Sequence, residues 1–176
     1  MKVFIRVMDL VGPQNSCIGM GQALQVRGHQ VHFLINEQLK GKFSRFAFVE
    51  HLLREDPDRV ARKAASTPLD PIEQICDSII KVGLCENITS FEKMKRLVNV
   101  DFFEELYLHA AEFEPQIKAL LEAERPDLII IDCDIVSPCL LHYPHAPWMC
   151  LYCSNPIGFF DSDQLPPFTS GRMLLL

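Results

Sequence analysis

The order of apolar and helical segments in residues 2–35 is the feature that most constrains the fold. Residues 2–8 are a short apolar run with β-branched side chains, as expected for a buried strand. A helical pattern starts at Asn15 and stops at Gly28, and residues 29–35 then predict a second strand. A strand, a helix and a strand in so short a segment form a βαβ unit. Such a unit requires parallel strands joined by a right-handed crossover.

The rest of the chain fits the same α/β class. Residues 46–49 and 148–153 predict two further short strands, and residues 127–132 predict a central strand buried on both faces. Apolar side chains recur at helical spacing through residues 101–124, where Pro115 is expected to start a new helix or kink the old one. We therefore expect a Rossmann-like parallel sheet flanked by helices.

Charge and composition exclude several classes of protein. The chain has 17 Lys and Arg against 23 Asp and Glu, a formal charge of -6, so we expect no nucleic-acid partner. No apolar run approaches the ~20 residues of a membrane span, and Lys2, Arg6 and Asp9 interrupt the stretch that a signal peptide needs. Seven cysteines, an odd number, favour reduced thiols. These features predict a cytoplasmic protein without a transmembrane segment.

Phosphate-loop and metal motifs are weak or missing. Neither G-x-G-x-x-G nor a Walker lysine follows the first strand, so dinucleotide and P-loop binding are disfavoured. His142, His145, Cys150 and Cys153 have H-x-x-H and C-x-x-C spacing that could supply zinc ligands. The two cysteines, however, fall at i and i+3 of a predicted strand and point to opposite faces. We predict no metal site there.

The other histidines carry no predicted chemistry. His29 and His32 lie at the start of the second strand, opposite the carboxyl end of the sheet, and are interpreted as structural. His51 and His109 have no partner that the sequence identifies.

The carboxyl ends of the strands are the expected position of a site. In an open α/β sheet, ligands bind beyond these ends, so the loop from Asp9 to Ser16 and the residues after Ile131 should line one crevice. Asp132 and Asp134 are placed there as a general base or as the orienter of a base. A solvated strand end or a cap for the next helix is an equal alternative.

Four segments in order resemble the N-terminal domain of UDP-glycosyltransferases, enzymes of the two-domain GT-B fold. Residues 8–19 look like the first strand and loop of that family, and residues 24–31 like its "L-x-x-R-G-H-x-V" segment. Residues 125–132 are similar to its "K/R-P-D-L-I-I-x-D" strand. Residues 154–156, together with 165–168, are similar to its later loops. The resemblance covers nearly all of residues 1–176.

The resemblance implies transfer of a sugar from a UDP-sugar to a hydroxyl of a small lipophilic acceptor, without a metal. The N-terminal domain of the family holds the acceptor, which points to Gln14, Asn15 and Asn155 as acceptor-binding residues. Asp132 matches the aspartate that orients the catalytic histidine of the family. The UDP-sugar itself is bound mainly by a C-terminal domain that residues 1–176 do not contain, so no cofactor is expected in this chain.

Pro13 departs from the family pattern. The family has "G-H-x-N" in the first loop, and Pro13 occupies the position of the histidine that accepts the proton of the acceptor. A proline side chain has no lone pair for this step. We therefore expect a single acceptor-binding domain, incomplete at its C-terminal end, that does not transfer sugar alone. The alternative is a truncated, non-catalytic paralogue that at most binds a lipophilic small molecule.

Overall fold

The computed structural model describes residues 1–58, 60–61, 71–97, 101–133, 135 and 137–152. They fall into two units, one made of the described residues within 1–61 and 107–152 and the other of those within 71–106. The strands of the first unit are β1 (Lys2–Arg6), β2 (Gln30–Asn36), β3 (Val49–Leu53), β4 (Leu128–Asp132) and β5 (Trp148–Leu151). The α-helices of the chain are α1 (Val11–Val26), α3 (Pro71–Lys81), α4 (Ser90–Leu97), α5 (Asp101–Glu124) and α6 (Pro138–Leu141).

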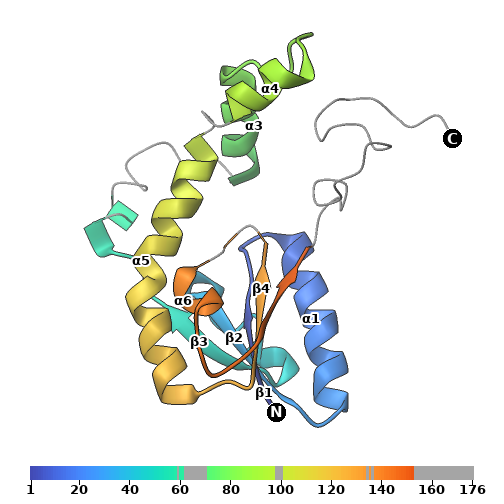
Figure 1. Cartoon of the computed structure of the whole chain (residues 1–176), viewed down its shortest axis with the longest axis vertical. Coiled ribbons are helices and arrows are strands. Elements are labelled where there is room, and N and C mark those ends of the chain that lie inside the picture. The colour runs from blue at the N-terminus through green and yellow to red at the C-terminus, as the bar shows by residue number, and fades with distance from the viewer. Residues whose placement is uncertain (59, 62–70, 98–100, 134, 136, 153–176) are drawn as a thin grey trace, which may run out of the picture. The chain divides into compact units, whose positions relative to one another are not determined.

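The five strands make one sheet in the order β3-β2-β1-β4-β5, and every neighbouring pair is parallel. The predicted Rossmann-like α/β fold is confirmed. Figure 1 shows α1 on one side of the sheet and α5 on the other. Because β1 and β4 lie at the centre, their carboxyl ends are adjacent at one edge of the sheet.

Two apolar layers hold the helices against the sheet. Alternate strand residues such as Ile5 and Phe33 pack with Cys17 of α1, while Phe4 and Ile129 pack with Phe113 of α5. All six of these side chains are fully buried. A strand buried on both faces has an almost continuous apolar sequence, which explains why the runs at 2–8 and 127–132 were recognisable.

The starts of two predicted elements were wrong, and of the two outcomes expected at Pro115 the start of a new helix did not occur. The third strand begins at Val49, because residues 44–46 form a short 3-10 helix before it. Helix α5 continues through Pro115 as one element from Asp101 to Glu124. Helix α1 begins at Val11, four residues earlier than the pattern predicted. Proline is compatible with the first turn of a helix, where its missing N–H has no partner to lose, so Pro13 did not delay the start.

The second unit contains α3 and α4. Thr89 caps α4, since the Thr89 hydroxyl accepts a hydrogen bond from the N–H of Glu92 at 3.2 Å. Arg96 of α4 donates to Glu86 at 2.8 Å and to the carbonyl of Gly83 at 3.2 Å. These hydrogen bonds connect α4 to the turn that follows α3.

Candidate functional site

Asp132 ends β4 at the carboxyl edge of the sheet. Its side chain is 1% exposed, and its Oδ2 accepts a hydrogen bond from the N–H of Met8, 3.3 Å away. Met8 is the second residue after β1, so the contact joins the end of β4 to the segment that leads into α1. The structure thus places the residues that follow β1 beside the end of β4. Asp134 lies outside the described residues.

Pro13 lies in the first turn of α1, not in a loop. Its side chain is half-buried, and it follows Gly12 at the end of the helix that faces the carboxyl edge of the sheet. The pyrrolidine ring offers neither a hydrogen-bond donor nor an acceptor. No proton can therefore be transferred to the side chain at this position.

Gln14 and Asn15 follow Pro13 but differ in surroundings. Gln14 is 1% exposed, and its Nε2 donates to Oδ1 of Asp9 at 2.8 Å. Its Oε1 is buried without a hydrogen-bond partner among the described residues. Asn15 is exposed, and Asn155 lies outside the described residues. A buried carbonyl oxygen without a donor is energetically unfavourable.

Arg6 is a buried cation beneath this edge that the sequence analysis did not identify as a site residue. Its guanidinium donates to the carbonyl of Leu34 and to Asn36, and lies 5.3 Å from the centre of the Phe113 ring. Burial lowers the pKa of Arg6 to about 10, although the charge of Asp132 opposes this shift. Arg6 and Asp132 are therefore opposite charges in one buried region. The feature of the sequence that could have identified Arg6 is a charged residue inside an otherwise apolar strand.

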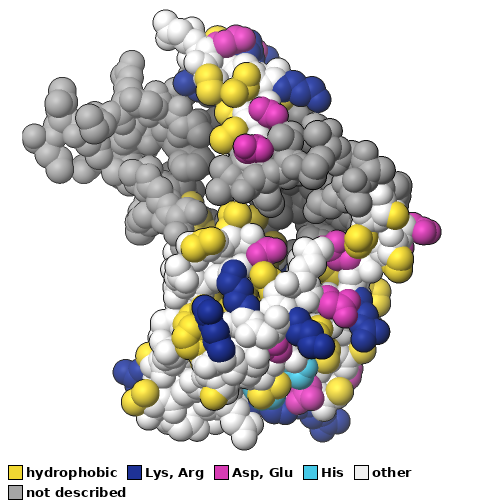
Figure 2. Space-filling model, turned by 180° about the vertical axis from the view of Figure 1, so that it is seen from behind, with side chains coloured by type: hydrophobic (Ala, Val, Ile, Leu, Met, Phe, Trp, Pro, Cys, Tyr) yellow, Lys and Arg dark blue, Asp and Glu magenta, His cyan; other side chains and the backbone are white. Residues whose placement is uncertain are grey.

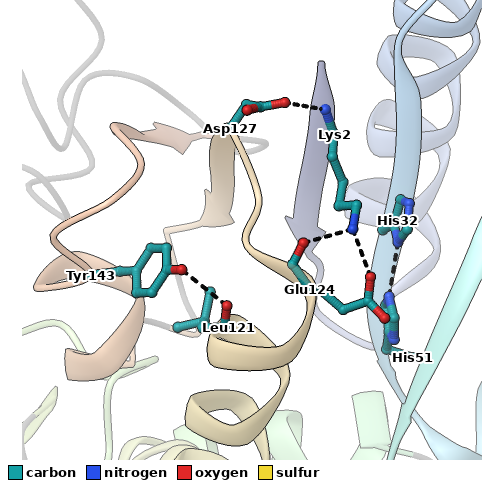
Figure 3. A network of polar contacts seen from close by, with 7 residues as sticks. All are labelled: Lys2, His32, His51, Leu121, Glu124, Asp127 and Tyr143. Atoms are coloured by element: carbon teal, nitrogen blue, oxygen red, sulfur yellow. Dashed lines mark hydrogen bonds and ion pairs between the residues drawn. The ribbon is translucent and has the colours of Figure 1, made fainter.

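A second polar cluster lies at the opposite end of the strands (Figure 3). Nδ1 of His32 on β2 and Nε2 of His51 on β3 are 2.9 Å apart. Glu124, the last residue of α5, forms an ion pair with Lys2 at 2.7 Å. Burial is the largest cause that lowers the pKa of both His32 and His51. The sequence identified no partner for His51, because register between β2 and β3 cannot be deduced from single strands; the structure shows that its partner is His32.

His142, His145 and Cys150, the described residues among those considered as zinc ligands, do not form a group of possible metal ligands. In the described parts of the chain, side chains close enough to share a metal ion occur only at His32, His51 and Glu124. Cys150 is exposed on β5, His142 and His145 are exposed beyond α6, and Cys153 lies outside the described residues. Figure 2 shows acidic and basic side chains interspersed over the described surface of one face, with some histidine surface among them.

None of the described helices combines the length and the apolar character that crossing a bilayer requires.

Neither a family model nor a curated protein sequence matches the chain. Solved structures do match, and they are glycosyltransferases of the GT-B fold. The calicheamicin glycosyltransferase CalG4 matches with a TM-score of 0.57 and 12% identity over 94% of this chain and 34% of its own. The glycosyltransferase VinC, in complex with dTDP, matches with a TM-score of 0.55 and 17% identity over 87% of this chain and 35% of its own.

The spinosyn rhamnosyltransferase SpnG, complexed with thymidine diphosphate, also matches, with a TM-score of 0.55 and 13% identity over 87% of this chain and 35% of its own. At these identities the likeness shows a shared fold. The chain spans about a third of the length of the glycosyltransferases that it matches.

Proposed function

We propose, from a fold shared with GT-B glycosyltransferases, that residues 1–176 form the acceptor-binding part of a sugar transferase. The sugar would come from a UDP-sugar and go to a hydroxyl of a small lipophilic acceptor. The observation that carries the proposal is the buried carboxylate of Asp132, held by the Met8 N–H at the carboxyl edge of the sheet. Catalysis by a base and a carboxylate requires the carboxylate to be fixed next to the base. Asp132 is fixed next to the segment that leads to residue 13, the position where the resemblance places the base.

We further propose that transfer is impaired at Pro13. A positioned general base contributes typically 10²- to 10⁴-fold in rate. The proline ring cannot accept a proton, so Asp132 has no base at residue 13 to orient. Water or a neighbouring group would then have to accept the proton from the acceptor hydroxyl, at a much lower rate.

Residues 1–176 alone are proposed to transfer no sugar. The solved glycosyltransferases that they match are about three times as long, and two of these structures hold thymidine diphosphate. Transfer requires donor and acceptor to be aligned within one site, and this alignment supplies a large part of the rate. A donor-binding part is therefore the partner that the activity needs.

The test is a chimera in which these residues precede the donor-binding part of a solved glycosyltransferase. Transfer to phenolic acceptors is measured by mass spectrometry with Pro13, with Pro13→His and with Pro13→Ala as the matched control. We expect the histidine to raise the initial rate about 10²-fold or more and the alanine to leave it unchanged. Equal rates with proline and histidine would contradict the role assigned to residue 13.

A non-catalytic binding protein is the second candidate function. Pro13 favours it because it removes the base, and the unpartnered Oε1 of Gln14 favours it because it leaves a buried hydrogen-bond acceptor for a ligand hydroxyl. The same chimera separates the two candidates. Saturable binding of the phenol without transfer, even in the Pro13→His variant, supports this second function.

A further inference from the structure

Three metal-ligating side chains converge at the amino end of the strands, away from Asp132. His32 comes from β2, His51 from β3 and Glu124 from the C-terminal end of α5. Nδ1 of His32 and Nε2 of His51 are 2.9 Å apart, and the ligand atoms of all three residues lie within 4.8 Å of one another. Figure 3 shows the Glu124 side chain extending toward His51.

These distances are close to those of a bound transition-metal ion. Imidazole nitrogens and carboxylate oxygens bind Zn²⁺ at about 2.0–2.2 Å, so two ligands of one tetrahedral ion are about 3.3 Å apart. The His32 and His51 ring centroids are 5.2 Å apart, so the two facing nitrogens point directly at each other. To share one tetrahedral ion, the nitrogens must separate by a few tenths of an ångström and both rings must rotate so that their lone pairs converge on it. The Glu124 carboxylate has to move further toward the two ring nitrogens than these have to move apart. It can do so because its side chain has rotatable bonds and lies at the end of a helix.

The sheet holds the two histidines in place. In the register of β2 and β3, His32 pairs with Val49 and Leu34 pairs with His51, so the two histidines are diagonal neighbours on adjacent strands. The Phe4 ring lies 5.5 Å from the His32 ring and 5.2 Å from the His51 ring. His32 is buried and His51 is half-buried. An ion can therefore enter from the solvent side and find both histidines on backbone that the sheet holds fixed, so that only the ring torsions have to change.

The hydrogen between the histidines does not block an ion. In the His32–His51 contact, one of the two facing nitrogens carries the hydrogen. Tautomerisation of that ring moves the hydrogen to its other nitrogen, so both facing lone pairs become available without a change in charge.

The Lys2 ammonium competes with a metal ion for the carboxylate of Glu124. Its ammonium donates to Oε2 of Glu124 at 2.7 Å and to the backbone carbonyl of Glu124 at 2.6 Å. A cation bound to the histidines must share or take over this carboxylate and is repelled by the ammonium. The affinity for an ion thus depends on Lys2, which gives the site a testable property that a purely structural cluster lacks.

We propose that His32, His51 and Glu124 bind one divalent transition-metal ion, with Zn²⁺ as the ion that fits best. Two nitrogens and one carboxylate oxygen suit zinc, whereas magnesium and calcium prefer ligands that are all oxygen. Three protein ligands leave the fourth tetrahedral position to water.

The first experiment is calorimetric titration of ZnCl₂ into the chelator-treated, reduced 176-residue chain. We expect one saturable site, and weakening by more than about tenfold in His32→Gln and in His51→Gln. His142→Gln, at an exposed histidine outside the cluster, is the matched control and should bind as the wild type does. Circular dichroism in EDTA checks that each variant is folded. Binding that is unchanged in both cluster variants, or missing in the wild type, overturns the proposal.

Two further measurements keep the proposal falsifiable if a histidine variant does not fold. Lys2→Met removes no ligand but frees the carboxylate, so zinc affinity should rise several-fold. An unchanged or lower affinity contradicts the site. Co²⁺ gives the second measurement, because its complex with His32, His51 and Glu124 should show tetrahedral d–d absorption without a thiolate charge-transfer band. A thiolate band would assign the metal to the cysteines instead.

Discussion

Both terminal nitrogens of the Arg6 guanidinium donate hydrogen bonds to the same side-chain oxygen of Asn36, each at 3.3 Å. Arg6 is on β1 and Asn36 ends β2, so this contact joins two adjacent strands at the carboxyl edge of the sheet. Both side chains are buried. A buried cation is tolerated only while its donors have acceptors, which makes Asn36 important for the stability of this edge.

Asn36→Ala should therefore destabilise the fold by about 2–3 kcal/mol, because it removes the acceptor of two charged donors and leaves the cation buried. Urea denaturation followed by circular dichroism measures the change. Asn15→Ala is the matched control at an exposed position of α1, and it should change stability by less than about 0.7 kcal/mol. An equal effect of both substitutions would show that the Arg6 contact does not contribute.

Two glycines of α1 should respond in opposite directions to alanine. A Cβ at Gly21 would lie 2.9 Å from the Phe48 ring, which is 4% exposed and 4.9 Å from the Phe33 ring, so it has little room to move. At Gly19 nothing lies within 4 Å of a Cβ. We expect Gly19→Ala to stabilise by about 0.5–1 kcal/mol through helix propensity.

Gly21→Ala gains the same propensity but overpacks the core, which costs about 1–3 kcal/mol, so the net effect should be destabilising. Thermal unfolding of the two variants side by side gives the comparison. A higher melting temperature for Gly21→Ala would mean that Phe48 moves aside at little cost.

The sequence predicted the central strands β1, β2 and β4 well because they are buried on both faces. The runs around Val3 and Ile130 are almost continuously apolar and end in polar residues, a pattern that few other elements share. The start of α1 was misplaced because Pro13 was interpreted as part of a loop, although proline is equally suited to a first helical turn. Local sequence does not distinguish these two positions.

The polar clusters could not be predicted in the same way. His32 and His51 meet because β2 pairs with β3 in one particular register, and Glu124 joins them because α5 ends beside β1. These relationships depend on tertiary packing over long sequence separations. Asp132 and the first loop, by contrast, were placed together from topology alone, since parallel strands have their carboxyl ends at one edge.

Glu50 should make the stability of the fold depend on acidic pH. Its carboxylate accepts hydrogen bonds from the N–H groups of Gly41, Phe43 and Ser44 at 2.7–2.8 Å. Burial raises the pKa of Glu50, but these hydrogen bonds outweigh it and lower the pKa below its ordinary value of 4.5. The charged form is thus favoured in the folded state, and its contribution is fully present above pH 4.5 and is lost as pH falls through the lowered pKa.

Glu50→Gln should lower the urea midpoint at pH 7, and its difference from the wild type should shrink as pH falls below 4.5. Denaturation series from pH 7 to about pH 3 provide the test. Glu122→Gln, at an exposed side chain of α5, is the matched control and should leave the midpoint at pH 7 close to wild type. A difference that stays constant across the series would contradict the assignment to Glu50.

Nucleotide binding tests the proposed division of labour between acceptor and donor parts. Because residues 1–176 span about a third of the glycosyltransferases that they match, we expect no measurable heat when UDP or dTDP is titrated into them. The chimera described above is the positive control and should bind its nucleotide. Saturable micromolar binding by residues 1–176 alone would contradict this expectation.

The role proposed for Asp132 depends on the residue at position 13. Asp132→Asn keeps an oxygen that accepts from the Met8 N–H but removes the charge that faces the buried Arg6, so circular dichroism is used first to select conditions in which the variant is folded. In the chimera with Pro13→His, the charge orients and balances the histidine, and its loss should lower the transfer rate about tenfold or more. With Pro13 in place there is no histidine to orient, and Asp132→Asn should leave the residual rate nearly unchanged. The ratio of these two effects is a double-mutant coupling that a purely structural aspartate would not produce. Equal losses in both backgrounds would assign Asp132 to the stability of the edge around Met8 and Arg6 and not to the orientation of a base.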